Sequence, residues 1–392
     1  MQKRIDLGIV VAVAALSLIG LIMIFSTAGI STFTRQLTWL AASIATAVVF
    51  SKISPRLWST LAPFIYFGVI LMLVLLLFTS DSYPKRWFKL GWINLQPSEF
   101  AKFATILFLA TVLAAKKRLK NFSDILIPLL IVSIPAALIF IEPDLGAAQI
   151  FYPILILMLY WAGMPGVKLF IFFSPIISAA ASFSIYIWVL YFVGLTVFLY
   201  FHKQLSDLVY GLVSNFLAGL SMPIIWNSLK PYQQQRIISF FSPWLDPKGM
   251  SWQTIQSKIA IGSGGIIGKG FLSGTQKRLE FLPERHTDFV FSCLGEEFGL
   301  VGIVLTTLIF GYLLYKILIL TKETKNKFSS ILASGILAWF SYQTFINIGM
   351  TLGLLPVTGV PLPFISYGGS SLLACFMAVG VCMAISKSKF KY

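Results

Sequence analysis

The stretch LGIVVAVAALSLIGLIMIF, residues 7–25, decides the fold class of this 392-residue chain. It contains no charged residue, and as an α-helix rising about 1.5 Å per residue it would be roughly 28 Å long. That length matches the ~30 Å hydrocarbon core of a lipid bilayer. Apolar runs of similar length recur from one end of the sequence to the other. We therefore predict an all-α polytopic membrane protein whose first run is an uncleaved helix rather than a signal peptide.

The composition supports this prediction. Only 11% of the residues are charged and 57% are hydrophobic, whereas soluble proteins carry roughly 25% charged residues. A formal net charge of +16 would suggest nucleic-acid binding in a soluble protein. Here Lys and Arg lie mainly in short connections and at both termini, where they hold loops on the cytoplasmic side of a membrane. We expect no nucleic-acid partner, and the spacing of the Cys and His residues suggests neither a disulfide nor a zinc site.

Hydropathy windows of about nineteen residues give between ten and twelve spans. The candidates lie at 7–28, 36–53, 60–79, 99–115, 125–141, 146–163, 168–185, 186–201, 209–226, 297–318, 329–349 and 370–386. The pair 168–185 and 186–201 has almost no polar break, so it forms either a hairpin or one long irregular helix. Alternation from the basic N-terminus places both termini and every short basic loop on the cytoplasmic side.

A long polar segment at 227–296 falls on the outer face in this topology. We expect it to carry short amphipathic or re-entrant helices. Its basic residues outnumber its acidic residues by eight to four before Glu296, which a long loop tolerates outside. This excess suits an anionic ligand at the outer leaflet.

Ionisable residues close to or inside the spans are candidates for function, because they are costly at membrane depth. Glu99 and Lys102 are three residues apart and therefore share a helix face. They form a structural ion pair, line a substrate cavity, or do both. The turn Glu142-Pro143-Asp144 lies between two spans at the outer boundary, where it is either a simple turn or part of a site.

The glycine-rich run at 262–270 has the wrong spacing for a nucleotide-binding loop. Its backbone amides, together with Lys258 and Lys269, could still surround a phosphate. The alternative is a segment lying on the membrane with tight turns.

Asp288 is the strongest candidate for chemistry. It lies between Thr287 and the apolar run 289–291, so we expect partial burial to raise its pKa and to suit it to general-base catalysis. The alternative is a cap or turn residue. Further along, residues 353–371 combine three prolines and four glycines in an apolar region. Such non-helical backbone at membrane depth is tolerated only where it is buried in protein or lines a cavity.

Together these segments resemble the SEDS family (shape, elongation, division and sporulation) of bacterial cell-wall polymerases. The resemblance extends over most of the chain, in order, through Arg86-Trp87, Gln96-Pro97-Ser98-Glu99 with Lys102, Pro143-Asp144-Leu145-Gly146, Tyr232-Gln233 with Arg236, Gln256-Ser257, Gly262-Ser263-Gly264-Gly265, Leu282-Pro283-Glu284 with His286-Thr287-Asp288, and Pro361-Leu362-Pro363-Phe364 with Ser366-Tyr367-Gly368-Gly369. The segments at 283–288, 347–350 and 356–361 look more like the RodA (elongation) branch than the FtsW (division) branch.

The resemblance implies a peptidoglycan glycosyltransferase that polymerises lipid II at the outer face of the bacterial cytoplasmic membrane and releases undecaprenyl pyrophosphate. The matching catalytic residue is Asp288. The resemblance, with the charges noted above, implies these substrate-binding residues: Trp87, Glu99, Lys102, Asp144, Arg236, Lys258, His286, Glu297 and Ser366. Arg236 and Lys102, with or without a divalent cation (Mg²⁺ or Mn²⁺), would offset the charge on the leaving pyrophosphate, and no organic cofactor is implied. The implied partners are a class B penicillin-binding protein, MreC and MreD.

The chain departs from the family pattern in two places. Tyr83-Pro84-Lys85 replaces the small Gly-Ala pair expected before the basic-Trp element, which weakens the assignment of Trp87. The family core has ten spans, so our surplus of two suggests an extra helical insertion at about 186–226 within a single membrane domain covering residues 1–392. Two other functions fit a polytopic bundle, namely a lipid II flippase and a non-catalytic scaffold.

Overall fold

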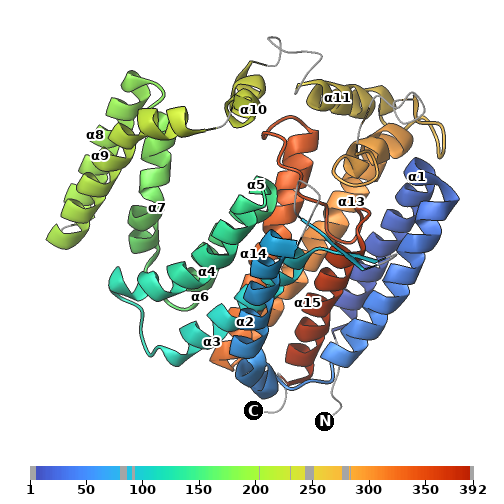
Figure 1. Cartoon of the computed structure of the whole chain (residues 1–392), viewed down its shortest axis with the longest axis horizontal. Helices are drawn as coiled ribbons and strands as arrows, with labels where there is room; N and C mark the ends of the chain where they lie inside the picture. The colour runs from blue at the N-terminus through green and yellow to red at the C-terminus, as the bar shows by residue number, and fades with distance from the viewer. Residues whose placement is uncertain are drawn as a thin grey trace.

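The computed structural model describes residues 6–79, 86–90, 93–202, 204–229, 231–242, 251–275, 282 and 284–388. This part of the chain is almost entirely helical (Figure 1), which confirms the predicted all-α membrane fold. The exception is an antiparallel pair of three-residue strands, β1 (Phe88–Leu90) and β2 (Ile93–Leu95). The helices are α1 (Leu7–Phe50), α2 (Pro55–Thr79), α3 (Pro97–Ala115), α4 (Ser123–Ile141), α5 (Leu145–Gln149), α6 (Phe151–Trp161), α7 (Gly166–Ala181), α8 (Ile185–His202), α9 (Leu205–Ser228), α10 (Pro231–Phe241), α11 (Trp252–Gly264), α13 (Val290–Glu323), α14 (Lys327–Thr351) and α15 (Gly369–Ser388).

Helix lengths agree with the predicted spans. Within the described ranges, eight helices are long and apolar enough to cross a bilayer, and three shorter apolar helices lie at 145–161, 166–181 and 185–201. Helix α1 has 44 residues and contains a non-helical residue, Gly29. It therefore holds two of the predicted spans, one on each side of Gly29. Helices α7 and α8 are separate, so the segment at 168–201 is a hairpin.

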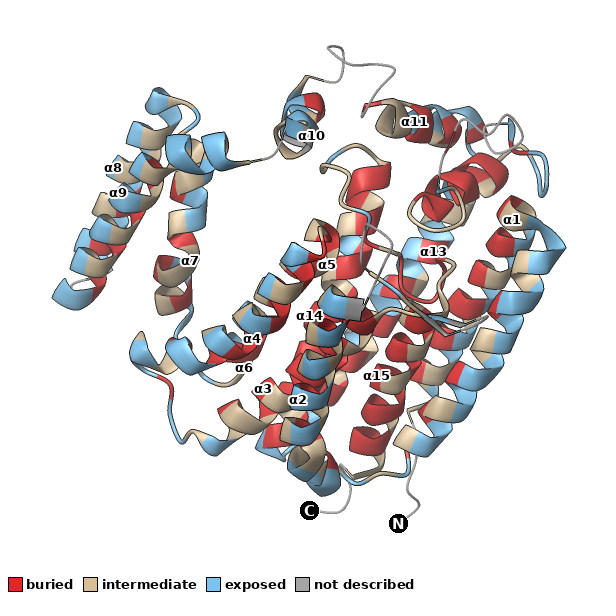
Figure 2. Cartoon of the chain, viewed as in Figure 1, coloured by how far each residue is buried: buried red, intermediate tan, exposed pale blue. Residues whose placement is uncertain are grey.

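The core lies around α3, α14 and α15, whose residues are mostly buried, whereas only a minority of the residues of α2 and α9 are buried (Figure 2). Helix α15 packs along α1, and α14 packs against α13, α6 and α3. The predicted short helices of the long polar segment are α10 and α11, which lie at one end of the bundle. Helix α1 begins and α15 ends at the opposite end (Figure 1).

Helices α7, α8 and α9 form a lateral unit with a polar interior. The Nδ2 atom of Asn215 donates to Ser174 Oγ (2.7 Å), and the hydroxyl of Tyr191 donates to Asn215 Oδ1 (3.1 Å). Lys168 Nζ lies 3.7 Å from Asp207 Oδ1. Because buried polar groups must be satisfied inside a membrane helix bundle, these contacts specify how the three helices pack together.

Candidate active site

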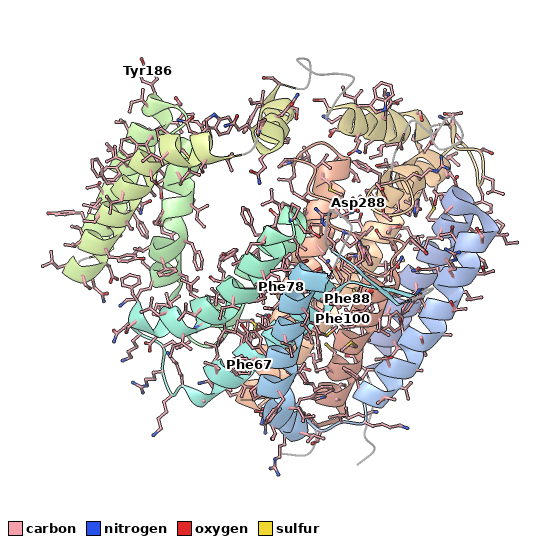
Figure 3. The ribbon with its side chains drawn as sticks, in the orientation of Figure 1. Phe67, Phe78, Phe88, Phe100, Tyr186 and Asp288 are labelled. Atoms are coloured by element: carbon pink, nitrogen blue, oxygen red, sulfur yellow. The ribbon has the colours of Figure 1, made fainter. Side chains whose placement is uncertain are left out.

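Asp288 lies just before α13, at the end of the bundle that carries α10 and α11 (Figure 3). Its side chain is partly buried. The loop between α14 and α15 approaches it closely, since a β-carbon placed on Gly359 would lie 3.4 Å from Asp288 Oδ2. Gly359 has φ +72°, a conformation that side chains with a β-carbon rarely adopt. A glycine therefore fits the position beside the carboxylate.

The three residues 286–288 are held to that loop and to α14 through their carbonyl groups. Tyr367 N donates to His286 O (2.9 Å), Ser366 Oγ donates to Thr287 O (2.6 Å), and Asn347 Nδ2 donates to Asp288 O (3.0 Å). We call these three donors the carbonyl clamp. The proline- and glycine-rich loop is thus packed against the segment that carries Asp288, as expected for non-helical backbone buried in protein.

The turn at 142–144 meets the same loop from α4 and α5. A β-carbon on Gly146 would lie 2.1 Å from the carbonyl oxygen of Thr358, so this close approach requires glycine. Asp144 Oδ1 accepts from Ala147 N (3.1 Å) and caps α5. The Arg86 guanidinium lies 3.8 Å from Asp144 Oδ2 and donates to the carbonyl of Pro143. Asp144 therefore caps α5 and faces Arg86, and substrate binding by Asp144 stays a prediction.

Glu142 is a buried carboxyl beside this turn. It is 1% exposed, and its Oε1 has no hydrogen-bond partner among the described residues. Burial raises the pKa of Glu142 to about 8, and the neighbouring Asp144 adds to the rise, although Arg86 opposes it. At pH 7 the side chain is therefore mostly the neutral acid.

The predicted pair Glu99 and Lys102 is a buried ion pair inside α3. Lys102 Nζ lies 2.7 Å from Glu99 Oε1, and both side chains are almost completely buried. Lys102 Nζ also lies 5.3 Å from the centre of the Trp339 ring. The ion-pair alternative is confirmed, while substrate contact by either residue stays a prediction.

Comparison with known proteins places this geometry in a family. A family model described as "Cell cycle protein", covering FtsW, RodA and SpoVE proteins, matches residues 5–192 and 183–391. This is a SEDS protein. The peptidoglycan glycosyltransferase MrdB of Escherichia coli K12 is 35% identical over 393 residues, covering 98% of this chain and 94% of MrdB. The peptidoglycan glycosyltransferase RodA of Treponema pallidum is 32% identical, covering 97% of each chain. Relatives named FtsW also match.

A solved structure supports the same conclusion. A chain from the study "Structural coordination of polymerization and crosslinking by a peptidoglycan synthase complex" has a TM-score of 0.76 and 27% identity, covering 99% of both chains. Together with the apolar helices, these relatives identify the SEDS protein as a multi-pass membrane protein.

The glycine-rich segment of this SEDS protein has a different role from the phosphate site considered above. The amides of Lys269 and Gly270 donate to the carbonyls of Glu296 and Glu297, each at 3.0 Å. In return, Leu300 N donates to Gly265 O (2.9 Å), and Val301 N donates to Ile266 O (3.1 Å). The phosphate hypothesis is wrong for these amides, because they bind protein carbonyls.

These backbone bonds close a break in α13. Gly299 has φ +62° and interrupts the helix, which leaves amide and carbonyl groups without partners inside the helix. The glycine-rich segment supplies those partners, so we call it the backbone splice. Lys269 Nζ also pairs with Glu296 Oε1 at 2.8 Å. Glu297 Oε1 accepts from Ser26 Oγ (2.5 Å) and so links α13 to α1.

The other predicted site residues come from separate elements of the chain. Trp87 is 40% exposed just before β1. Lys258 is exposed on α11 and passes over Gly353. Burial lowers the pKa of the His286 imidazole, despite the opposing charge of Glu284, so the ring is neutral at pH 7. The Arg236 side chain lies outside the described residues.

The structure brings Asp288, His286 and Ser366 together and places Gly146, two residues after Asp144, against the same loop. The Ser366 hydroxyl donates to Thr287 O and accepts from Leu362 N (2.8 Å), so substrate binding by Ser366 stays a prediction. The described residues contain no group of three or more His, Cys, Asp or Glu side chains that could hold a metal ion. A divalent cation held by fewer side chains together with the substrate phosphates stays a prediction.

Sequence reasoning did not assign a role to Asn347, and it considered Glu142 only as part of the turn at 142–144. Asn347 is a polar residue inside an apolar span. The rule that intramembrane polar groups are expensive and usually functional would have selected it. Its partners, however, come from segments distant in sequence and become visible only in the fold.

Proposed function

We propose that this protein is a peptidoglycan glycosyltransferase that polymerises lipid II into glycan strands for cell elongation and the maintenance of rod shape, releasing undecaprenyl pyrophosphate. The observation that carries the proposal is a carboxylate, Asp288, whose backbone is fixed by the carbonyl clamp at one end of a membrane-embedded bundle. Relatives that match almost the whole chain bear the name peptidoglycan glycosyltransferase.

In the proposed reaction, the 4-hydroxyl of the acceptor sugar attacks the anomeric carbon of a second lipid II molecule. The new bond joins that oxygen to the anomeric carbon, and the bond from the anomeric carbon to the pyrophosphate oxygen breaks. Asp288 takes the hydroxyl proton as general base. The bonding electrons leave with undecaprenyl pyrophosphate, whose negative charge needs compensation.

The cations near the loop suggest how that charge is offset. Lys102 is already paired with Glu99 and is buried, so its positive charge is largely compensated within α3. Lys258 is exposed, and the Arg86 side chain is 33% exposed. We assign the leaving pyrophosphate to these two cations together with the predicted Arg236. The neutral His286 ring can accept a hydrogen bond from a sugar hydroxyl.

The proposed setting is the bacterial cytoplasmic membrane, with both termini inside and Asp288 at the outer face. The basic short loops support this orientation through the positive-inside rule. A class B penicillin-binding protein is the proposed crosslinking partner, and the similar solved chain comes from a peptidoglycan synthase complex. MreC and MreD are proposed members of the same assembly.

The test is polymerisation of fluorescent lipid II by the purified full chain in nanodiscs, alone and with its penicillin-binding partner. We expect glycan strands from the wild type and none from Asp288→Asn or Asp288→Ala, with lipid II binding retained. The control is Asp124→Asn, which removes a carboxylate paired with Lys116 in the first turn of α4. The turn at 142–144 lies at the opposite end of that helix, so this change should leave polymerisation unchanged.

Two results would contradict the proposal. Full polymerisation by Asp288→Asn would show that Asp288 is not the general base. The second result is that neither wild type nor Asp288→Asn makes strands, while both move lipid II across the liposome membrane. A flippase would then be the correct function, because transport does not need that carboxylate.

A further inference from the structure

Asn347 is a buried amide in an apolar helix. It lies near the end of α14, and its side chain is 0% exposed. Burying an amide without hydrogen bonds destabilises the folded state. Asn347 avoids part of that cost, because Nδ2 donates to Asp288 O (3.0 Å) and to Val360 O (2.8 Å). Both amide hydrogens are therefore used on backbone from two other segments.

These two acceptors belong to the parts of the chain that define the site. One is the carbonyl of the proposed catalytic residue. The other follows Gly359 directly, and Gly359 is the loop residue that lies beside Asp288 Oδ2. A single planar amide thus sets the separation between the Asp288 backbone and the loop that faces its carboxylate.

Asn347 differs from the other two donors of the carbonyl clamp in where it is anchored. Ser366 and the Tyr367 amide come from the α14–α15 loop itself. Asn347 comes from α14, which is mostly buried and packs against α13, α6 and α3. A donor on a packed helix defines a position more firmly than a donor on a loop, because the helix has fewer alternative positions.

We propose that Asn347 is a positioning residue that sets the Asp288 carboxylate for proton removal from the acceptor hydroxyl. This inference rests on the proposed function. Asn347 does not touch the reacting atoms in this scheme, and it acts through the Asp288 carbonyl and the Val360 carbonyl. A displacement of about 1 Å at a reacting group costs roughly 100-fold in rate. We therefore expect its loss to lower kcat much more than it changes KM.

The chain offers a matched control in Asn215. This residue is also 0% exposed in a membrane helix, and its Nδ2 also donates two bonds, to Ser174 Oγ and Gly211 O, both at 2.7 Å. It lies in α9, which with α7 and α8 forms the lateral unit beside the main bundle (Figure 1). Asn215→Leu therefore removes the same kind of buried amide without touching the carbonyl clamp.

The experiment compares wild type, Asn347→Leu, Asn347→Ser and Asn215→Leu as full chains in nanodiscs. We expect Asn347→Leu to lower kcat for lipid II polymerisation about 100-fold, with KM nearly unchanged and the acidic limb of the pH–rate profile displaced. Asn347→Ser, which retains one hydroxyl donor and serves if the leucine variant does not fold, should fall between that variant and wild type. Asn215→Leu should lower Tm while keeping kcat and the pH profile.

A second readout requires no activity. Amide hydrogen exchange of the peptide containing residues 284–290 should accelerate in Asn347→Leu and stay at the wild-type rate in Asn215→Leu. Wild-type kcat and pH profile in a folded Asn347→Leu protein, or unchanged exchange in that peptide, would overturn the positioning role. A wild type without polymerase activity would instead overturn the proposed function, and the exchange result would still decide whether Asn347 holds the segment.

Discussion

Replacing Glu142 with Gln should change how the stability of the protein depends on pH. Glu142 is 1% exposed, and its pKa is raised from an ordinary value of 4.5 to about 8. The folded protein therefore binds more protons than the unfolded chain between these two pH values. Since stability falls with pH wherever the folded state binds more protons, the contribution of the neutral acid is fully present below pH 4.5 and is lost as pH rises through 8.

The size of the effect follows from the two pKa values. Their difference is 8 − 4.5 = 3.5 pH units, and at about 1.4 kcal/mol per unit this corresponds to at most about 5 kcal/mol of unfolding free energy. The Glu142→Gln protein has no proton to lose. Its unfolding free energy should therefore lack this decline, and its advantage over wild type should be largest above pH 8.

The assay is thermal unfolding in detergent, followed by tryptophan fluorescence between pH 5 and pH 9. The control is Glu323→Gln, which makes the same chemical change at an exposed carboxyl. Difference infrared spectroscopy supplies a direct check, because the protonated carboxyl signal should titrate near pH 8 in wild type and be absent from Glu142→Gln. Parallel Tm curves for wild type and Glu142→Gln, or a carboxyl signal lost near pH 4.5, would refute the reasoning.

Three further single substitutions and one double substitution test the packing of the site. Gly359→Ala should reduce polymerisation, because a residue with a β-carbon is strained at φ +72° and would shift the loop beside Asp288 Oδ2; wild-type rates would show that the loop adapts. Gly146→Ala should lower stability by about 1–3 kcal/mol, since its β-carbon would overlap a loop carbonyl, and an unchanged Tm would contradict this. Lys102→Met should lower the free energy of unfolding by about 3–5 kcal/mol, because it leaves Glu99 buried without its ion-pair partner. The double variant with Glu99→Leu should recover most of the decrease in Tm. If it does not, the stabilisation by Lys102 comes from a contact other than Glu99.

The helical part of the fold was predictable because bilayer thickness dictates the length of apolar runs. The same rule could not show that Gly29 interrupts α1, since that interruption depends on local φ and ψ. Asp288 was identifiable as a carboxylate at the edge of an apolar run. The glycine-rich segment was open to two interpretations, because its true partners are backbone groups exposed by the break at Gly299 in α13. Backbone partners leave no side-chain pattern in the sequence.

Glu142 and Asn347 show that side-chain partners, too, can be invisible in the sequence. Each is visible in the sequence as a polar residue in apolar surroundings. Nothing local indicates that Glu142 lies without a partner for Oε1, or that Asn347 reaches a carbonyl 59 residues away. Long-range contacts of this kind arise only after the helices have packed.

The backbone splice has a consequence for how this protein can change over generations. It joins the glycine-rich segment to α13 through main-chain atoms, while the side chains of Ile266 and Ile267 remain 69% and 82% exposed. Because the attachment uses backbone groups, we expect other side chains at these two positions to leave it intact. Gly264 and Gly268 have no such freedom, because a β-carbon at either would overlap a carbonyl of α13. Within these few residues, positions that accept different side chains therefore lie between positions that require glycine.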